Sequence, residues 1–165
     1  MKISTLLRWF SLTLLLILLD QVTKIWADSA LQLYRPVEIT PFFNLMLAYN
    51  PGAAFSFLSD AGGWQRWFFS LLSMVVSVVL IVWLTRLKEN EKWMAASLSL
   101  ILAGAIGNLI DRLAYGHVID FLDLYYKSHH WPAFNIADSV ICIGAVIMIA
   151  LTLREGKDEK KNESE

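Results

Sequence analysis

Asp120 and Asp138 are the two residues of this sequence whose types and expected proximity best support chemistry. Asp120 follows an apolar run that ends near residue 113, and Asp138 lies at the start of another run that begins near residue 134. If these runs are antiparallel neighbours in a bilayer, the two carboxyl groups meet on one side of it. Two carboxyl groups in contact share one proton, so one can act as a base and the other as an acid. Such a pair could activate water for attack on a peptide carbonyl and protonate the departing nitrogen.

Polar residues on the same two runs support this candidate site. Gly104, Asn108 and Arg112 follow one another at four-residue steps and therefore share one helical face. Asn135 lies three residues before Asp138, again on one face. Polar side chains are expensive beside hydrocarbon and by default indicate a functional site. We expect Asn108, Arg112 and Asn135 to hold the geometry or to bind peptide carbonyls.

An acid and a base also lie four residues apart in the first apolar run. Asp20 and Lys24 can pair on one helical face at the end of that run. Two interpretations stay open for them: a role in the site, or an interfacial ion pair in which Lys24 extends to the lipid headgroups. Asp111, next to Arg112, and Asp123 are better explained as local partners than as catalysts.

The composition indicates an integral membrane protein. Of 165 residues, 56% are hydrophobic and 18% charged, and the mean hydropathy of +0.50 is too high for an ordinary soluble domain. A net charge of −1 with no basic stripe excludes a nucleic-acid-binding class. The single cysteine, Cys142, excludes an intramolecular disulfide framework and cysteine-type zinc sites, and we expect it to pack as a small apolar residue.

Metal and cofactor chemistry is not indicated by the histidines. His117, His129 and His130 lie in one loop and lack the two-histidine helical spacing of a metallopeptidase. We therefore expect surface or interfacial histidines and a site that needs no metal and no cofactor.

Hydropathy predicts an all-α membrane protein of one domain with four transmembrane helices. The first run could be the apolar part of a signal peptide, with a weak cleavage site at residues 27–29, but it continues into Asp20 and Lys24, so we predict a retained helix. The predicted spans are about 6–27, 67–85, 93–113 and 134–153, with outer loops at 28–66 and 114–133 and a tail at 154–165. The densely charged tail has no apolar face, so we expect it to be solvated and disordered.

The first outer loop has a different character from the spans. Residues 28–65 hold three of the four prolines and two short extended stretches, at 37–40 and 43–47. This pattern predicts a folded extramembrane segment with a small sheet. The turn at Asn50 and Gly52 could bring backbone donors and acceptors close to an extended ligand, or be a turn and no more.

The basic residues predict the orientation. Nine of the fourteen lysines and arginines lie in the amino end, the connection between spans two and three, and the tail. The positive-inside rule therefore places both termini in the cytoplasm and loops 28–66 and 114–133 outside. The polar residues described above then gather at one depth, near the outer ends of the spans.

Five motifs resemble the signal peptidase II family, also called the bacterial lipoprotein signal peptidases. They cover nearly the whole chain in the family's order and spacing: DQVTK (20–24), NPGAAF (50–55), GAIGNLIDR (104–112), VIDF (118–121) and FNIADS (134–139). The resemblance implies an intramembrane aspartic endopeptidase of the bacterial inner membrane with its site on the periplasmic side. It would cut the signal peptide from a prolipoprotein just before the cysteine that bears a diacylglyceryl group.

The resemblance also implies roles for individual residues. Asp120 and Asp138 become the catalytic dyad. Eight further positions become structural or substrate-contacting residues: Asp20, Lys24, Asn50, Gly104, Asn108, Arg112, Asn135 and Ala137. The family implies a small extramembrane β-cradle from loop 28–65 and sensitivity to the cyclic peptide globomycin. We expect the chain to work as a monomer among membrane lipids.

Two hypotheses from other classes compete with the peptidase. A proton- or ion-coupled transporter would also bury acids and bases, but it should carry polar residues throughout the depth of the membrane. Here the run 67–85 is apolar and uncharged, and the polar groups lie at one depth. A non-enzymatic assembly subunit predicts that Asp120 and Asp138 can be replaced without loss of activity.

Overall fold

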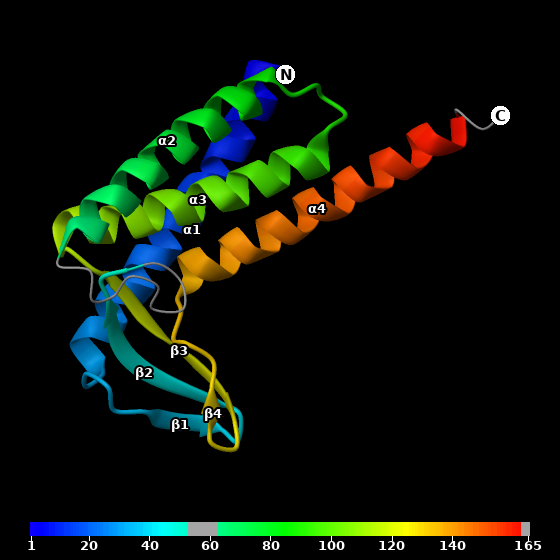
Figure 1. The fold of residues 1–165 in the computed structure, drawn as a ribbon. Coiled ribbons are helices and arrows are strands. Elements are labelled where there is room, and N and C mark those ends of the chain that lie inside the picture. The colour runs from blue at the N-terminus through cyan, green and yellow to red at the C-terminus, as the bar shows by residue number, and fades with distance from the viewer. Residues whose placement is uncertain (53–62, 163–165) are drawn as a thin grey trace.

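The structure, a computed structural model, describes residues 1–52 and 63–162 and contains four long helices and a small sheet (Figure 1). The helices are α1 (Ile3–Ala30), α2 (Trp64–Arg86), α3 (Lys92–Ala114) and α4 (Ile136–Asn162). Each is long and apolar enough to cross a bilayer, α4 over residues Ile136–Arg154. The predicted class, a four-helix membrane protein with a small extramembrane sheet, is confirmed.

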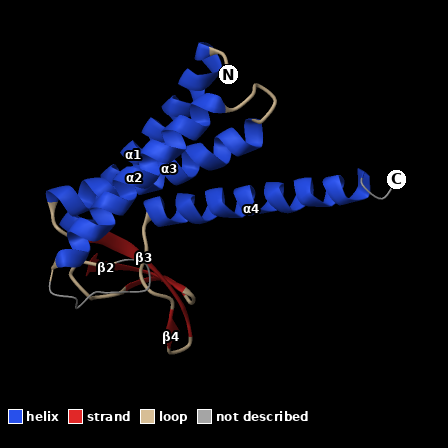
Figure 2. Cartoon of the chain, turned by 45° about the horizontal axis from the view of Figure 1, so that its top comes forward, coloured by secondary structure: helices blue, strands red, loops and turns tan. Residues whose placement is uncertain are grey.

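Helix α3 forms the centre of the bundle, and α1, α2 and α4 each pack against it (Figures 1 and 2). Small residues allow the closest of these contacts. A Cβ atom added to Gly104 would lie 2.3 Å from the carbonyl oxygen of Ala137 in α4. Further along, Ser97 Oγ donates to the carbonyl oxygen of Gly144 at 2.7 Å. Close backbone approach of this kind is how helices associate where no water drives them together.

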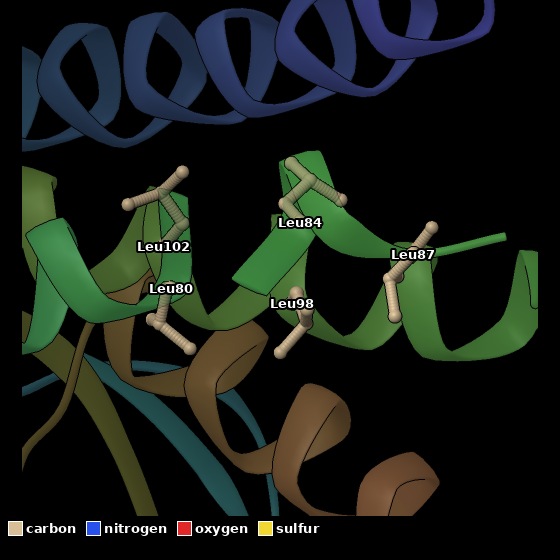
Figure 3. Close-up of a cluster of buried hydrophobic side chains, with 6 residues drawn as sticks. Leu80, Leu84, Leu87, Leu98 and Leu102 are labelled. Atoms are coloured by element: carbon tan, nitrogen blue, oxygen red, sulfur yellow. The ribbon is translucent and has the colours of Figure 1, made fainter. Parts of the chain in front are cut away.

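An apolar cluster joins α2 and α3 at the end of the bundle away from the sheet (Figure 3). Its buried members are Leu80, Leu84, Leu87, Ala95, Leu98 and Leu102. The cluster therefore holds α2 and α3 together through apolar packing.

The sheet has four antiparallel strands in the order β1-β2-β3-β4 and lies beyond the other end of the bundle (Figure 1). Its strands are β1 (Val37–Thr40), β2 (Phe43–Asn50), β3 (Val118–Tyr126) and β4 (His129–His130). The extended stretches predicted at 37–40 and 43–47 are β1 and β2. Loop 28–65 forms part of the sheet as expected, and β3 and β4 from the second outer loop complete it.

Pairing between β2 and β3 carries the functional residues. Val118 is the partner of Asn50, and Asp120 is the partner of Ala48. Since side chains alternate along a strand, Asn50 and Asp120 point to the same face of the sheet. Asp120 thus lies on a strand rather than in an irregular loop, which gives it a defined direction.

The charged tail also differs from its prediction. Helix α4 continues to Asn162, whereas disorder was expected from residue 154. Glutamate and lysine are good helix formers, and extending an existing helix needs only one further hydrogen bond per residue, so an apolar face is not required.

Candidate active site

Asp120 and Asp138 are brought together around the side chain of Asn135. The amide nitrogen of Asn135 donates to Asp120 Oδ1 at 2.7 Å, and its amide oxygen accepts from the backbone N–H of Asp138 at 2.9 Å. Asp138 in turn accepts from the backbone N–H of Asn135 at 3.3 Å. Asn135 therefore caps α4 reciprocally with Asp138, as in a capping box, while its remaining donor holds Asp120.

The carboxyl group of Asp120 is almost fully buried, with an exposed fraction of 2%. Its second oxygen accepts from the amide of Asn50 at 3.1 Å. Burial raises the pKa of Asp120 from 3.8 to about 8, and the nearby charge of Asp138 adds to the increase. Asp120 is thus protonated near neutral pH.

Asp138 is held from the opposite side by Asn108. Asn108 Nδ2 donates to Asp138 Oδ1 at 2.8 Å, and Asn108 Oδ1 accepts from the ammonium group of Lys24 at 3.0 Å. Because an ammonium group can only donate, it fixes which end of the Asn108 amide faces Asp138. The predicted helical face of Gly104, Asn108 and Arg112 does turn towards α4 and the site.

Lys24 is the centre of a buried ionic network. Its ammonium group lies 2.9 Å from Asp20 and 2.8 Å from Asp111, and with Asn108 these complete its three hydrogen bonds. Lys24 is only 1% exposed, so the interpretation that it extends to the headgroups is wrong. Gln21 joins the network by donating to Asp111 at 2.9 Å.

Two members of this network, Asp111 and Gln21, were not predicted to belong to it. Asp111 was predicted to be a local partner, but its ion pair is with Lys24 of another helix, and it also accepts from the backbone N–H of Ile119 at the start of β3. Gln21 carried no signal beyond its place inside the motif 20–24. Side chains of the first and third helices meet here, and periodicity within one helix does not report such a contact.

Asp20 and two glycines fix the start of α4. Asp20 Oδ1 accepts from the backbone N–H of Ala137 at 2.8 Å, which satisfies a free donor in the first turn. Ala137 is fully buried. A Cβ atom at Gly107 would lie 2.6 Å from the Asp20 carboxylate, so glycine leaves room for it, as Gly104 leaves room for Ala137.

Arg112 lies at the edge of the site. Its guanidinium donates to the carbonyl oxygen of Gly52 at 3.0 Å and lies over the ring of Phe69, 5.4 Å from the centroid. Its Nε is buried and has no hydrogen-bond partner among the described residues. Gly52 and Asn50 belong to the motif 50–55, whose residues 53–55 lie outside the described part of the chain.

A cavity of about 260 Å³ opens beside Asp138. Its lining is mainly apolar and includes a few polar side chains. The lining residues are Asn50, Asn108, Arg112, Val118, Leu124, Trp131, Pro132, Ala133, Phe134, Asp138, Ser139 and Cys142. Cys142, expected to pack as a small apolar residue, is exposed on α4 and belongs to this lining. A mostly apolar cavity with a few convergent polar groups is typical of a ligand site.

The histidines lie away from the two carboxylates. His130 bonds to Asp123 at 2.9 Å, and Asn44 donates to the same carboxylate, so Asp123 is the local partner that was predicted. His117 packs against Tyr49, with ring centroids 4.2 Å apart. In the described part of the chain, no three His, Cys, Asp or Glu side chains gather so that they could hold a metal ion.

Comparison with known proteins identifies the family. The family model of signal peptidase (SPase) II matches residues 12–154. The lipoprotein signal peptidase of Pseudomonas putida is 52% identical over 153 residues, which cover 92% of this chain and 89% of that protein. The lipoprotein signal peptidase of Teredinibacter turnerae is 56% identical over 144 residues, which cover 87% of this chain and 85% of that protein.

Solved structures agree with this match. One structure of a bacterial membrane enzyme superposes with a TM-score of 0.83 at 30% identity, covering 92% of this chain and 90% of the other. A second bacterial membrane enzyme gives a TM-score of 0.77 at 31% identity, with coverage of 88% and 92%. These matches favour the peptidase over the transporter and the assembly subunit. The chain belongs to the signal peptidase II family, the multi-pass aspartic endopeptidases of the bacterial inner membrane that remove signal peptides from prolipoproteins.

Proposed function

We propose that Asp120 and Asp138 are the catalytic dyad with which this peptidase cuts a prolipoprotein just before its diacylglyceryl-modified cysteine. The observation that carries the proposal is the position of Asn135, whose side-chain amide donates to the carboxyl group of Asp120 and whose backbone N–H donates to that of Asp138. Asn135 holds the two carboxyl groups at a common site on one end of the bundle. Asp138 also lines the cavity, where a peptide could meet it.

The two aspartates differ in environment, and we assign them different roles. Asp120 is the buried member and carries the proton near neutral pH. Asp138 lies on the cavity in the first turn of α4, where its carboxyl group accepts from two N–H donors. Asp138 takes a proton from water as the water oxygen attacks the carbonyl carbon. Asp120 supplies the proton that the departing nitrogen needs when the C–N bond breaks.

The supporting residues divide into two groups in this mechanism. Asn50, Asn108 and Arg112 line the cavity and can contact the substrate peptide. A second group is buried behind the cavity and holds the frame: Asp20, Lys24, Gly104, Asn135 and Ala137.

We further propose that both termini are cytoplasmic and that the site faces the periplasm. The sheet and the site lie at one end of the bundle, and the amino terminus lies at the other (Figure 1). There the Lys2 backbone N–H donates to Glu89 of the α2–α3 connection, in the region where basic residues are dense. The working unit is a monomer in contact with membrane lipids, and globomycin would bind in the cavity beside Asp138.

Conservative substitution tests the dyad. Wild type, Asp120→Asn and Asp138→Asn would be purified in detergent and compared for cleavage of a diacylglyceryl-modified prolipoprotein. Asparagine keeps the shape and removes the acid–base chemistry, so we expect each variant to fold and to lose about 10⁴-fold in rate. Asp123→Asn is the matched control, because Asp123 is a buried aspartate of the same strand whose partners are Asn44 and His130 instead of Asn135. Near wild-type cleavage by Asp120→Asn or Asp138→Asn would contradict the assignment.

A further inference from the structure

Arg66, in the first turn of α2, binds the carboxyl end of α3. Its Nε donates to the carbonyl oxygen of Arg112 at 2.7 Å, and its Nη2 donates to the carbonyl oxygen of Leu113 at 3.0 Å. The last carbonyl groups of a helix lack full intrahelical partners and carry partial negative charge, so an arginine there is favourable. The guanidinium also lies 5.0 Å from the ring centroid of Trp67, which limits its freedom.

The turn after α3 is shaped to admit this side chain. Gly116 has a φ of +87°, and a Cβ atom there would lie 3.3 Å from Arg66 Nη1. Glycine therefore serves both the left-handed backbone and the close approach of the guanidinium. The contact joins the start of α2 to a distant part of the chain, formed by the end of α3 and the turn that leads into β3.

Arg112 is fastened through both its main chain and its side chain. Arg66 holds its carbonyl oxygen, while its own guanidinium donates to the carbonyl oxygens of Gly52 and Asn108, at 3.0 and 3.3 Å. Arg112 is also the arginine that lines the cavity with Asp138. A shift of the last turn of α3 would therefore move a cation within the site.

We propose that Arg66 is a positioning residue of the peptidase reaction, which keeps the guanidinium of Arg112 in place by holding the carbonyl end of its helix. The inference rests on the proposed function, because it treats Arg112 and the two aspartates as one site. Arg66 does not line the cavity, so its influence on the reaction passes through Arg112.

The charged groups around Arg112 determine what its displacement would change. They are Lys24 of α1, Asp111 of its own helix, Asp120 of β3 and Asp138 of α4, with Arg66 behind it on α2. A cation beside a carboxyl pair favours loss of the shared proton. When Arg112 moves away, the pair holds that proton to higher pH. The alkaline fall in activity then moves upward, an effect that a loss of general stability does not produce.

The test compares Arg66→Gln and Arg66→Lys with Arg86→Gln, a change of the exposed arginine at the far end of α2. Each purified variant would be assayed for kcat and KM on a diacylglyceryl-modified prolipoprotein across a range of pH, with thermal unfolding measured in parallel. For Arg66→Gln we expect kcat to fall about tenfold to a hundredfold, since a small displacement of a positioning group has effects of this size. We expect the alkaline limb of the pH–rate profile of Arg66→Gln to move to higher pH by on the order of 1 unit. Arg66→Lys keeps a charged donor, so its kcat and its alkaline limb should lie between those of wild type and Arg66→Gln. Arg86→Gln should match wild type in both.

Three outcomes would overturn the inference: an unchanged kcat, a lower kcat with an unmoved alkaline limb, or an equal effect of Arg86→Gln. If Arg66→Gln fails to fold, Arg66→Lys decides the same comparison with a smaller expected shift. An error in the assignment of the catalytic dyad would be detected separately, because Asp120→Asn or Asp138→Asn would then still cleave the substrate. Loss of cleavage in those two variants together with an unmoved limb in the Arg66 variants would reject the inference alone.

Discussion

The two ends of the helical bundle differ in their contacts, which are polar and ionic at one end and apolar at the other. At the end beside the sheet, Lys24 and Asp20 are buried in a network of ionic and hydrogen bonds. At the other end, Leu84 and Leu98 are equally buried, in an apolar cluster (Figure 3). In both regions α3 contacts a neighbouring helix. The two regions differ in the kind of contact that α3 makes.

This difference shows what each kind of contact can specify. Apolar packing tolerates changes that keep the volume, because it has little direction. A buried hydrogen bond has a fixed donor, acceptor and angle, and it costs free energy when one partner is lost. The polar end can therefore hold Asp138 to a defined geometry, whereas the apolar end holds the helices together.

The largest effect is expected when the cation at the centre of the polar end is removed. Lys24→Met leaves Asp20 and Asp111 buried without their ion pair, and we expect a loss of about 3 to 5 kcal/mol in the free energy of unfolding. Thermal unfolding in detergent measures it, with the exposed Lys92→Met as the control. An unchanged unfolding midpoint for Lys24→Met would mean that the network does not stabilise the fold.

A cavity in the apolar end should affect stability without affecting chemistry. Leu98 is fully buried, so Leu98→Ala should cost about 2 to 4 kcal/mol, while Leu98→Met should cost less than about 1.5 kcal/mol. In both variants we expect the cleavage rate per folded molecule to equal that of wild type. A rate that falls with stability would show that the two ends are coupled.

When the contact between α3 and α4 is overpacked, the effect on cleavage should depend on how far the substituted glycine lies from the site. A Cβ atom at Gly104 would lie 2.3 Å from the Ala137 oxygen, and one at Gly144 would lie 2.8 Å from the Ser97 oxygen. We expect either glycine-to-alanine change to cost about 1 to 3 kcal/mol. Gly104→Ala should also slow cleavage, because it displaces the turn that carries Asp138. Equal rates for Gly104→Ala and Gly144→Ala would contradict this.

The dependence of stability on pH should come from the polar end. The pKa of Asp120 is raised from 3.8 to about 8 by burial, so the folded chain holds this proton more tightly than the unfolded chain. Stability from this group is present below pH 3.8 and is lost as the pH rises to about 8. The slope is at most about 1.4 kcal/mol per pH unit. Unfolding followed across this range should show the decline in wild type and Leu98→Ala, and a smaller one in Asp120→Asn.

Local patterns in the sequence were enough for much of this architecture. Four apolar runs of spanning length predict the helices, because a bilayer requires about twenty apolar residues for each crossing. The strands β1 and β2 follow from extended stretches between prolines, and Asp120 and Asp138 stand out because acids beside apolar runs need a reason to be there. The resemblance to signal peptidase II, carried by five motifs in order, named the family that the comparisons then confirmed.

Only the tertiary structure decided which of these residues meet. Asn135 links two aspartates of different elements, Lys24 turns inward to Asp111, and Arg66 holds the carbonyl oxygen of Arg112. Each contact joins residues that are distant in the chain, and its energy depends on burial and direction rather than on residue type alone. A period of 3.6 residues reports which side chains share a face, but it carries no information about the partner that the face will contact.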